Sequence, residues 1–309
     1  MNVLNQHTTD THTLYHGDCI EVTRGLPDES IDFTVFSPPF ASLYTYSNSE
    51  RDLGNCLNET EFFEQFAFLV TELYRVTKPG RVIAVHCMEL PRLKSKDGFI
   101  GVYDFPGDLI RCFCPAGFHF DGRCTIWKDP VTAMQRTKSI RLLHKQLVKD
   151  STISGWALPD YLLKFKKPGV NAEPVEGELD RFVGDSSMFS PSGRRSIDVW
   201  QRYASPVWMD INQSNTLQFR AAREQDDERH ICPLQLDVIE RCIELWSNPN
   251  DVILSPFAGI GSEGYEAVKL GRKFIGIELK ESYYKLACKN LGAGVQVANE
   301  GRLQFEGVT

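Results

Sequence analysis

Residues 252–262 read VILSPFAGIGS, and this stretch decides the fold. The apolar residues 252–254 predict a strand, which runs into a turn with Gly259 and Gly261 before a helix begins. A strand, a glycine turn and a helix in this order are typical of an open α/β sheet that binds a nucleotide. Glycines let the backbone approach a ligand closely, and the start of the helix offers free N–H groups.

An acidic residue ends the next predicted strand, which covers residues 274–278. In dinucleotide-binding sheets, a carboxylate at this place accepts hydrogen bonds from both ribose hydroxyls. A tight turn without a ligand explains the Gly259-Ile260-Gly261 run alone equally well. Glu278 is therefore the residue that favours a nucleotide site.

The same alternation of strands and helices extends outward from the glycine turn. It predicts a mostly parallel sheet, because strands separated by single helices pair in parallel. The expected strands are residues 14–16, 31–36, 81–86, 118–127, 252–254 and 274–278, and the expected helices are residues 59–76, 104–116, 234–246, 263–270 and 282–291.

The length and composition fit one large α/β domain that carries an inserted smaller unit. The chain has 309 residues, of which 42% are hydrophobic and 24% charged, and no stretch is apolar enough for a membrane span. Residues 1–13 lack a signal-peptide pattern, so we expect a cytoplasmic protein. None of the nine cysteines forms a CxxC pair, so we expect no metal site. We expect reduced core thiols at the seven cysteines with apolar neighbours: Cys19, Cys87, Cys112, Cys114, Cys124, Cys242 and Cys288.

Between about residues 128 and 229 the regular alternation fails, which predicts an inserted recognition region. Positive charge gathers where this region begins, although the whole chain has a formal charge of −7. A local basic face is what a nucleic-acid enzyme needs, and a solvated helix face is the alternative. The basic residues of this stretch are Arg123, Lys128, Arg136, Lys138, Arg141, Lys145 and Lys149, against the single acid Asp129.

A second candidate site is the run Ser37-Pro38-Pro39-Phe40, which follows the predicted strand 31–36. Open α/β sheets place their active sites at the carboxyl ends of their strands. The two prolines fix the backbone and offer carbonyl oxygens without competing N–H groups, beside an aromatic ring. This rigid platform suits a flat base that carries an amino group, whereas an isolated match would also fit a structural loop.

The order of these motifs resembles that of the amino-methylating DNA methyltransferases of the permuted beta class. In that family a (D/N/S)-P-P-(Y/F) motif precedes F-x-G-x-G, and orphan and phage-type enzymes share the longer run of residues 37–46. The resemblance covers most of the chain outside about residues 129–229. It rests on His16-Gly17-Asp18, Ser37 to Phe40, the Lys78-Pro79-Gly80 turn, Trp127-Lys128, the helix 233–245 and residues 255–278.

The resemblance implies a Rossmann-like sheet of the kind found in methyltransferases that depend on S-adenosyl-L-methionine (AdoMet), with helices on both faces. Residues 1–128 would form the catalytic half, residues 129–229 the target-recognition region and residues 230–309 the AdoMet-binding half. Double-stranded DNA would be the partner. Relatives commonly form homodimers, to which the aromatic-rich helix 59–76 could contribute. The recognition region would contact DNA through Arg136, Lys138, Arg141, Lys145 and Lys149.

The resemblance also implies the cofactor contacts. Phe257, Gly259 and Gly261 would line AdoMet, and Glu278 would bind its ribose. Asp18 resembles a cofactor-side acid of the family, although an ordinary turn aspartate explains it as well. Relatives often carry Asp where this chain has Ser255, which leaves the contact to the methionine ammonium open. Of the family's entry to the helix 234–246, only His230 and Pro233 are recognisable.

The implied reaction is direct methyl transfer to the exocyclic amino nitrogen of a flipped base, without a covalent enzyme intermediate. Ser37 Oγ and the Pro38 carbonyl would accept hydrogen bonds from the amino group and favour a more pyramidal nitrogen, while Phe40 stacks on the base. Ser37 before Pro-Pro favours cytosine N4, whereas the run 37–46 resembles enzymes that act on adenine. We favour adenine N6, with cytosine N4 as the alternative.

Three other functions explain less of the sequence. A dehydrogenase would use the same glycine turn and acid for NAD, but it leaves residues 37–40 unexplained. An RNA or protein-amide methyltransferase fits the proline platform, but the basic stretch favours a polyanion such as DNA. A non-catalytic DNA-binding module would bind DNA without binding AdoMet.

Overall fold

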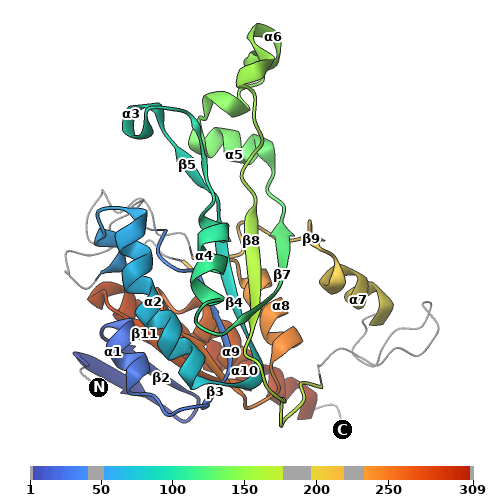
Figure 1. The fold of residues 1–309 in the computed structure, drawn as a ribbon. Helices are drawn as coiled ribbons and strands as arrows, with labels where there is room; N and C mark the ends of the chain where they lie inside the picture. Colours follow the sequence, from blue (N-terminus) through green and yellow to red (C-terminus); the bar gives the residue numbers. More distant parts are fainter. Residues whose placement is uncertain (1–2, 41–51, 177–195, 219–232, 307–309) are drawn as a thin grey trace.

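The computed structural model describes residues 3–40, 52–176, 196–218 and 233–306, with only the backbone for residues 196–199 and 301–306. Within these residues, nine strands form one sheet in the order β1-β2-β11-β10-β3-β4-β8-β7-β9 (Figure 1). The strands are β1 (Asn5–Thr8), β2 (His12–His16), β3 (Ile31–Phe36), β4 (Thr77–Met88), β7 (His119–Ile126), β8 (Asp160–Lys166), β9 (Val207–Trp208), β10 (Val252–Ser255) and β11 (Lys273–Glu278).

The sheet is parallel at its centre, as the sequence predicts. Neighbouring strands from β2 through β11, β10 and β3 to β4 all pair in parallel. The prediction that residues 118–127 continue this parallel run is wrong, because β8 lies between β4 and β7 and runs antiparallel to both. β8 falls in the range 129–229, where no strand was expected. That range therefore contributes to the sheet as well as to the parts that project from it.

Another difference concerns Lys78-Pro79-Gly80, where we expected a turn before the strand. β4 begins at Thr77 and passes through these residues as a bulge, because Ile31 and Phe33 of β3 pair with Thr77 and Val82. Gly80 has φ 75°, and a Cβ added there would lie 2.5 Å from the backbone nitrogen of Asn171. Close approach of the chain at Asn171 therefore requires a glycine at this bulge.

Helices cover both faces of the sheet, which confirms the predicted fold class. Alternate residues of β4 point to opposite faces, so Ile83 and Val85 join one core cluster while Val82 and Ala84 join the other. The first cluster packs under α1 (Cys19–Arg24), α2 (Glu59–Val76) and α4 (Phe105–Phe113). The second packs under α8 (Leu236–Trp246), α9 (Ser262–Lys269) and α10 (Glu281–Glu306).

The predicted helix 59–76 has the bounds of α2. Its first turn is capped by Asn58, whose Oδ1 accepts a hydrogen bond from the Glu61 N–H at 2.9 Å. Phe62, Phe66 and Leu69 recur at three- and four-residue spacing and are fully buried. Local sequence therefore decides both the start and the buried face of this helix.

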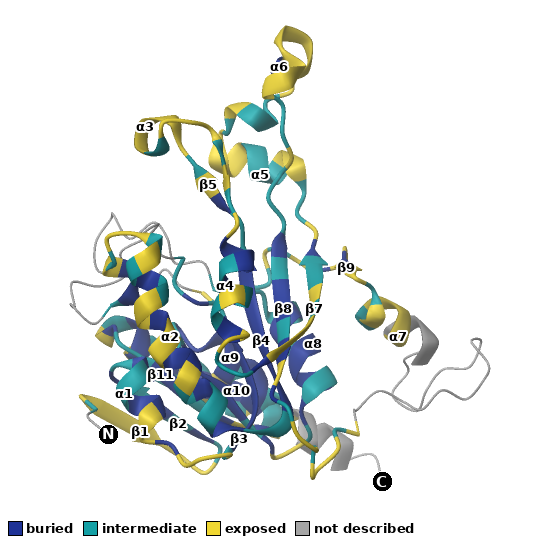
Figure 2. Ribbon diagram, viewed as in Figure 1, coloured by how far each residue is buried: buried dark blue, intermediate teal, exposed yellow. Residues whose placement is uncertain are grey.

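Two segments project beyond the carboxyl ends of the central strands (Figure 1). One, here called the arm, comprises residues 127–159 between β7 and β8 and holds α5 (Pro130–Thr137) and α6 (Lys145–Lys149). The other, the hairpin, comprises residues 90–103 with β5 (Leu90–Arg92), α3 (Lys94–Asp97) and β6 (Gly101–Tyr103). Figure 2 shows the central strands buried and both projections largely exposed.

Among the described residues, every helix is too short or too polar to cross a membrane. The cysteines described are all free, and Cys19, Cys87 and Cys242 are buried as expected. The expectation that Cys114 lies in the core is wrong, because it follows the last turn of α4 on the exposed side. Of its neighbours, Phe113 is fully buried, whereas Pro115 is exposed as well.

Candidate active site

A single large cavity joins the two motifs that the sequence singled out. It has a volume of about 1170 Å³ and lies where β2, β3, β4, β10 and β11 end. Small-molecule sites usually have roughly 300–1,000 Å³, so this cavity has room for a cofactor and part of a second substrate. Its walls include Ser37 to Phe40, the glycine turn, Glu278 and part of the arm.

The glycine turn and Glu278 are held together by backbone hydrogen bonds. Glu278 Oε2 accepts from the Gly259 N–H at 2.8 Å, and Oε1 accepts from the Lys280 N–H at 2.8 Å. Gly259 and Gly261 have φ angles of 53° and 86°, which favour glycine. The carboxyl group is therefore fixed at the cavity wall with lone pairs left for the two hydroxyls of a ribose.

Two carboxyl groups of this wall have raised pKa values. Burial raises the pKa of Glu278 to about 7 and that of Glu263, at the start of α9, to about 8. The charge of Glu278 also raises the pKa of Glu263, and the charge of Asp52 raises that of Glu278. A cationic ligand such as AdoMet would favour the ionised forms, so these acceptor groups fit that cofactor.

Of the other predicted cofactor residues, Phe257 lines the cavity, whereas Ser255 and Asp18 do not. Phe257 lines the cavity and packs against Phe36, with ring centroids 5.7 Å apart. Ser255 is fully buried beneath the turn, and its Oγ has no hydrogen-bond partner among the described residues. Asp18 Oδ1 caps α1 by accepting from the Glu21 N–H at 2.9 Å, and its neighbours Gly17 and Cys19 line the cavity in its place. Cofactor contacts of Asp18 and Ser255 stay predictions.

The proline platform lies at the end of β3, as expected for residues 37–40. Ser37, Pro38, Pro39 and Phe40 all line the cavity. The Phe40 ring is partly exposed there and meets the Phe105 ring edge-on, with centroids 6.1 Å apart. Ala41 to Tyr46, which favoured adenine, and His230 lie outside the described residues.

Ser37 connects to a chain of polar side chains that the sequence did not reveal. Its Oγ lies 2.8 Å from His86 Nδ1, and His86 Nε2 lies 3.2 Å from Asp160 Oδ2. The Lys128 ammonium donates a hydrogen bond to Asp160 Oδ1 at 2.6 Å. His86 and Asp160 are 7% and 2% exposed, and both line the cavity together with Lys128, so the polar chain forms a buried part of the cavity wall.

The basic residues of the arm divide between the cavity and the tip. Arg136, Lys138 and Arg141 line the cavity, together with Trp156, which is 88% exposed. Lys145 and Lys149 lie in α6 at the far end of the arm (Figure 1), outside the cavity wall. The structure therefore brings three of the five predicted DNA contacts to the site.

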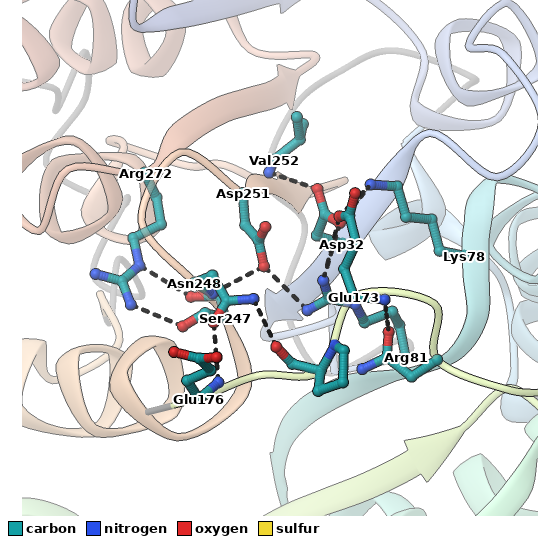
Figure 3. A network of polar contacts seen from close by, with 12 residues as sticks. Asp32, Lys78, Arg81, Glu173, Glu176, Ser247, Asn248, Asp251, Val252 and Arg272 are labelled. Carbon is teal, nitrogen blue, oxygen red and sulfur yellow. Dashed lines mark hydrogen bonds and ion pairs between the residues drawn. The ribbon is translucent and has the colours of Figure 1, made fainter. Parts of the chain in front are cut away.

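Three carboxylates near the opposite end of the sheet lie close enough to hold a cation: Asp32, Glu173 and Asp251. Two basic side chains already bind them (Figure 3). Lys78 Nζ lies 2.6 Å from Asp32 Oδ1, and Arg81 Nη1 lies 3.0 Å from Asp251 Oδ2. The cluster is therefore an ion-pair network that joins β3, β4 and the start of β10.

The comparisons with known proteins agree with this geometry. The DNA methylase family N6_N4_Mtase matches residues 31–289. The type II methyltransferase M.BglII of Bacillus subtilis is 25% identical over 289 residues, which are 89% of this chain and 67% of that protein. The DNA adenine methyltransferase YhdJ of Escherichia coli K12 is 25% identical over 292 residues, which are 91% of this chain and 83% of that protein.

A solved structure supports the fold. The cytosine-N4-specific PvuII DNA methyltransferase aligns with a TM-score of 0.63 at 18% identity, over 96% of this chain and 95% of its own. Because the family match spans most of the chain and the cavity residues fit AdoMet, this chain belongs to the N6/N4 DNA methylase family and is an AdoMet-dependent DNA amino-methyltransferase.

Proposed function

We propose that this protein methylates adenine at N6 in duplex DNA, after flipping the base into the cavity at the end of β3. The observation that carries the proposal is the shared cavity, which holds the proline platform and the glycine turn with Glu278. Cytosine N4 is the alternative, because both bases present an exocyclic amino group to the same acceptors.

Each wall of the cavity has a separate task in this proposal. AdoMet, held by the glycine turn, Phe257 and Glu278, supplies the methyl group. Ser37 Oγ and the Pro38 carbonyl accept hydrogen bonds from the amino group, and the Phe40 ring stacks on the extruded base. Fixed acceptors and a fixed ring orient the nitrogen, which supplies much of the acceleration in a direct transfer.

The nitrogen that is methylated can be mapped directly. Unmethylated plasmid DNA incubated with the protein and AdoMet is expected to carry N6-methyladenine at one short recognition sequence, read by single-molecule sequencing that distinguishes it from N4-methylcytosine. N4-methylcytosine would replace the proposal by its alternative. If RNA or protein is methylated under the same conditions while the DNA stays unmodified, DNA is not the substrate.

Glu278→Ala is expected to weaken AdoMet binding by about 1–3 kcal/mol, because this change removes one or two charge-assisted hydrogen bonds. With a pKa of about 7, Glu278 is protonated below pH 7 and loses acceptor lone pairs. Wild-type affinity should therefore fall as the pH is lowered from 8 to 6, and Glu278→Gln should remove part of this dependence. Glu263, with a pKa of about 8, accounts for the remainder.

Titration calorimetry measures this effect. Glu281→Ala is the matched control, because Glu281 begins α10 three residues away with its side chain 64% exposed and paired to Lys285. The control should keep the wild-type affinity. An unchanged affinity of folded Glu278→Ala would remove Glu278 from the cofactor site.

We further propose that the arm holds the DNA and that target recognition lies in this part of residues 129–229. The arm carries six basic residues against two acidic ones, although the whole chain is acidic. Arg136 and Lys138 are exposed at the cavity, where phosphates flanking a flipped nucleotide would pass. Trp156 adds an exposed ring suited to stacking.

Replacing Arg136, Lys138 and Arg141 together by glutamine is expected to lower the salt dependence of DNA binding. Neutralising one phosphate-binding side chain reduces the slope of log K against log[salt] by about one unit. Fluorescence anisotropy at several salt concentrations measures the slope. Lys145→Gln with Lys149→Gln is the comparison, and its effect should be smaller. An unchanged slope and affinity in the triple variant would exclude the arm from the interface.

A homodimer stays a prediction for this protein. α2, proposed as part of the interface, exposes Phe68 at 56%. A two-fold dimer would match a palindromic site. Light scattering that finds only monomers at micromolar concentration, with and without DNA, would contradict it.

A further inference from the structure

We propose that His86 and Asp160 act through Ser37 as a proton relay for methyl transfer, an inference that rests on the proposed function. The three residues come from neighbouring strands: Ser37 follows β3, His86 lies in β4 and Asp160 begins β8. All three line the cavity, and His86 and Asp160 are buried in its wall. The relay therefore leads from the reacting nitrogen along the buried wall of the cavity.

The charge of Asp160 decides which ring nitrogen of a neutral His86 carries the proton. Burial alone would raise the pKa of Asp160, but the hydrogen bond from His86 and the charge of Lys128 hold it below its ordinary value. The carboxylate can only accept hydrogen bonds, so a neutral His86 keeps its proton on Nε2, 3.2 Å from Asp160 Oδ2. Nδ1 is then an acceptor, and the Ser37 hydroxyl donates to it across 2.8 Å.

This arrangement fixes the direction in which Ser37 can act. Because its only proton is used on His86, Ser37 Oγ presents lone pairs to the cavity and can accept from an amino group. A serine with a free hydroxyl could present its proton instead, which would repel the N–H groups of the base. His86 is in this sense a positioning residue that makes Ser37 an acceptor.

The same chain can remove the proton that the reaction releases. The nitrogen lone pair forms the new C–N bond, and the pair of the broken S–C bond stays on sulfur. The methylated nitrogen then loses one proton to Ser37 Oγ, whose own proton moves to His86 Nδ1. The imidazolium formed is stabilised by the Asp160 carboxylate, and its extra proton leaves to solvent after product release.

The test is the pH dependence of single-turnover methylation by the full chain. His86→Gln keeps an amide that can accept from Ser37 and donate to Asp160, but it does not titrate. We expect its rate to fall by about tenfold or more and the inflection of the wild-type rate on the acid side to disappear. AdoMet and DNA affinities should stay within about twofold of the wild type. A purely structural defect would not leave both affinities intact while changing the pH–rate profile.

Two further variants separate the relay from a folding defect. Asp160→Asn removes the charge beside His86 and leaves Lys128, so the inflection should move to lower pH while the maximal rate falls. Ser37→Ala changes only the partly exposed end of the chain, so it should keep partial activity through the Pro38 carbonyl but lose the inflection. His119→Gln replaces an exposed histidine of β7 and is the control for both rate and profile.

A wild-type rate and inflection in folded His86→Gln would overturn the relay. So would an inflection that persists unchanged in Ser37→Ala, since the proposed path runs through that hydroxyl. These failures differ from failure of the proposed function, in which the wild-type protein would methylate neither adenine nor cytosine in DNA. If the wild type methylates DNA and the variants keep its rate and inflection, only the relay is contradicted.

Discussion

Phe40→Ala is expected to slow single-turnover methylation of a matched duplex by roughly 5- to 150-fold. A base stacked on an aromatic ring gains about 1–3 kcal/mol, and this change removes the ring that the platform offers. AdoMet affinity should be preserved, because Phe40 follows β3, whereas the glycine turn follows β10 and Glu278 ends β11. The effect should therefore lie in catalysis and base flipping.

A duplex with a mismatch at the target base tests the physical reason. A mismatch lowers the cost of flipping, so it should partly rescue Phe40→Ala if stacking mainly stabilises the extruded base. Phe120→Ala is the control, because Phe120 is an exposed phenylalanine of β7 outside the cavity. Full activity of Phe40→Ala on the matched duplex would exclude the proposed stacking role.

Arg81→Met is expected to lower the free energy of unfolding by about 3–5 kcal/mol at pH 8, because it leaves a buried carboxylate without its cation. The Arg81 side chain is 2% exposed between Asp251 and Asp32, which are 9% and 4% exposed. Asp32 retains the Lys78 ammonium at 2.6 Å, so the loss falls mainly on Asp251. Figure 3 shows both carboxylates around this guanidinium.

The sign of the pH dependence follows from Asp251. Burial already raises its pKa in the folded protein, so the folded state binds more protons than the unfolded one and its stability falls as the pH rises through that pKa. Removing Arg81 raises this pKa further. The destabilisation should therefore be larger at pH 8 than at pH 5.5, as urea titrations followed by tryptophan fluorescence would measure.

Arg24→Met is the matched control for the buried network. Arg24 pairs with Glu72 at 3.4 Å, but its side chain is 62% exposed. An exposed pair contributes about 0–1 kcal/mol, so this variant should unfold nearly as the wild type does. Equal effects of the two substitutions would show that burial of Arg81 adds nothing to its contribution.

The sequence by itself determined the central part of the fold and the two motifs of the site. Strand 31–36, helix 59–76 and the strand, turn and helix around Gly259 follow from local periodicity, proline and glycine, which act over a few residues. The acceptor platform at Ser37 and the carboxylate of Glu278 were found because parallel strands end at the same edge of a sheet.

Some site residues had a weaker signal or none. His86 ends the predicted strand 81–86, so the rule that found Ser37 also pointed to this position. Lys128 was counted among the basic residues but was not assigned to the site. Asp160 had no signal, because β8 has seven residues with charges among the apolar ones and lies in a range without regular alternation.

Only the tertiary structure decided what lies beside Ser37. β8 enters between β4 and β7 and brings Asp160 against His86, 74 positions earlier in the chain, and against Lys128. The tertiary structure also places Arg136 at the cavity and Lys149 at the tip of the arm. Strand order in a sheet is set by contacts between distant segments, and local periodicity does not predict which strands will pair.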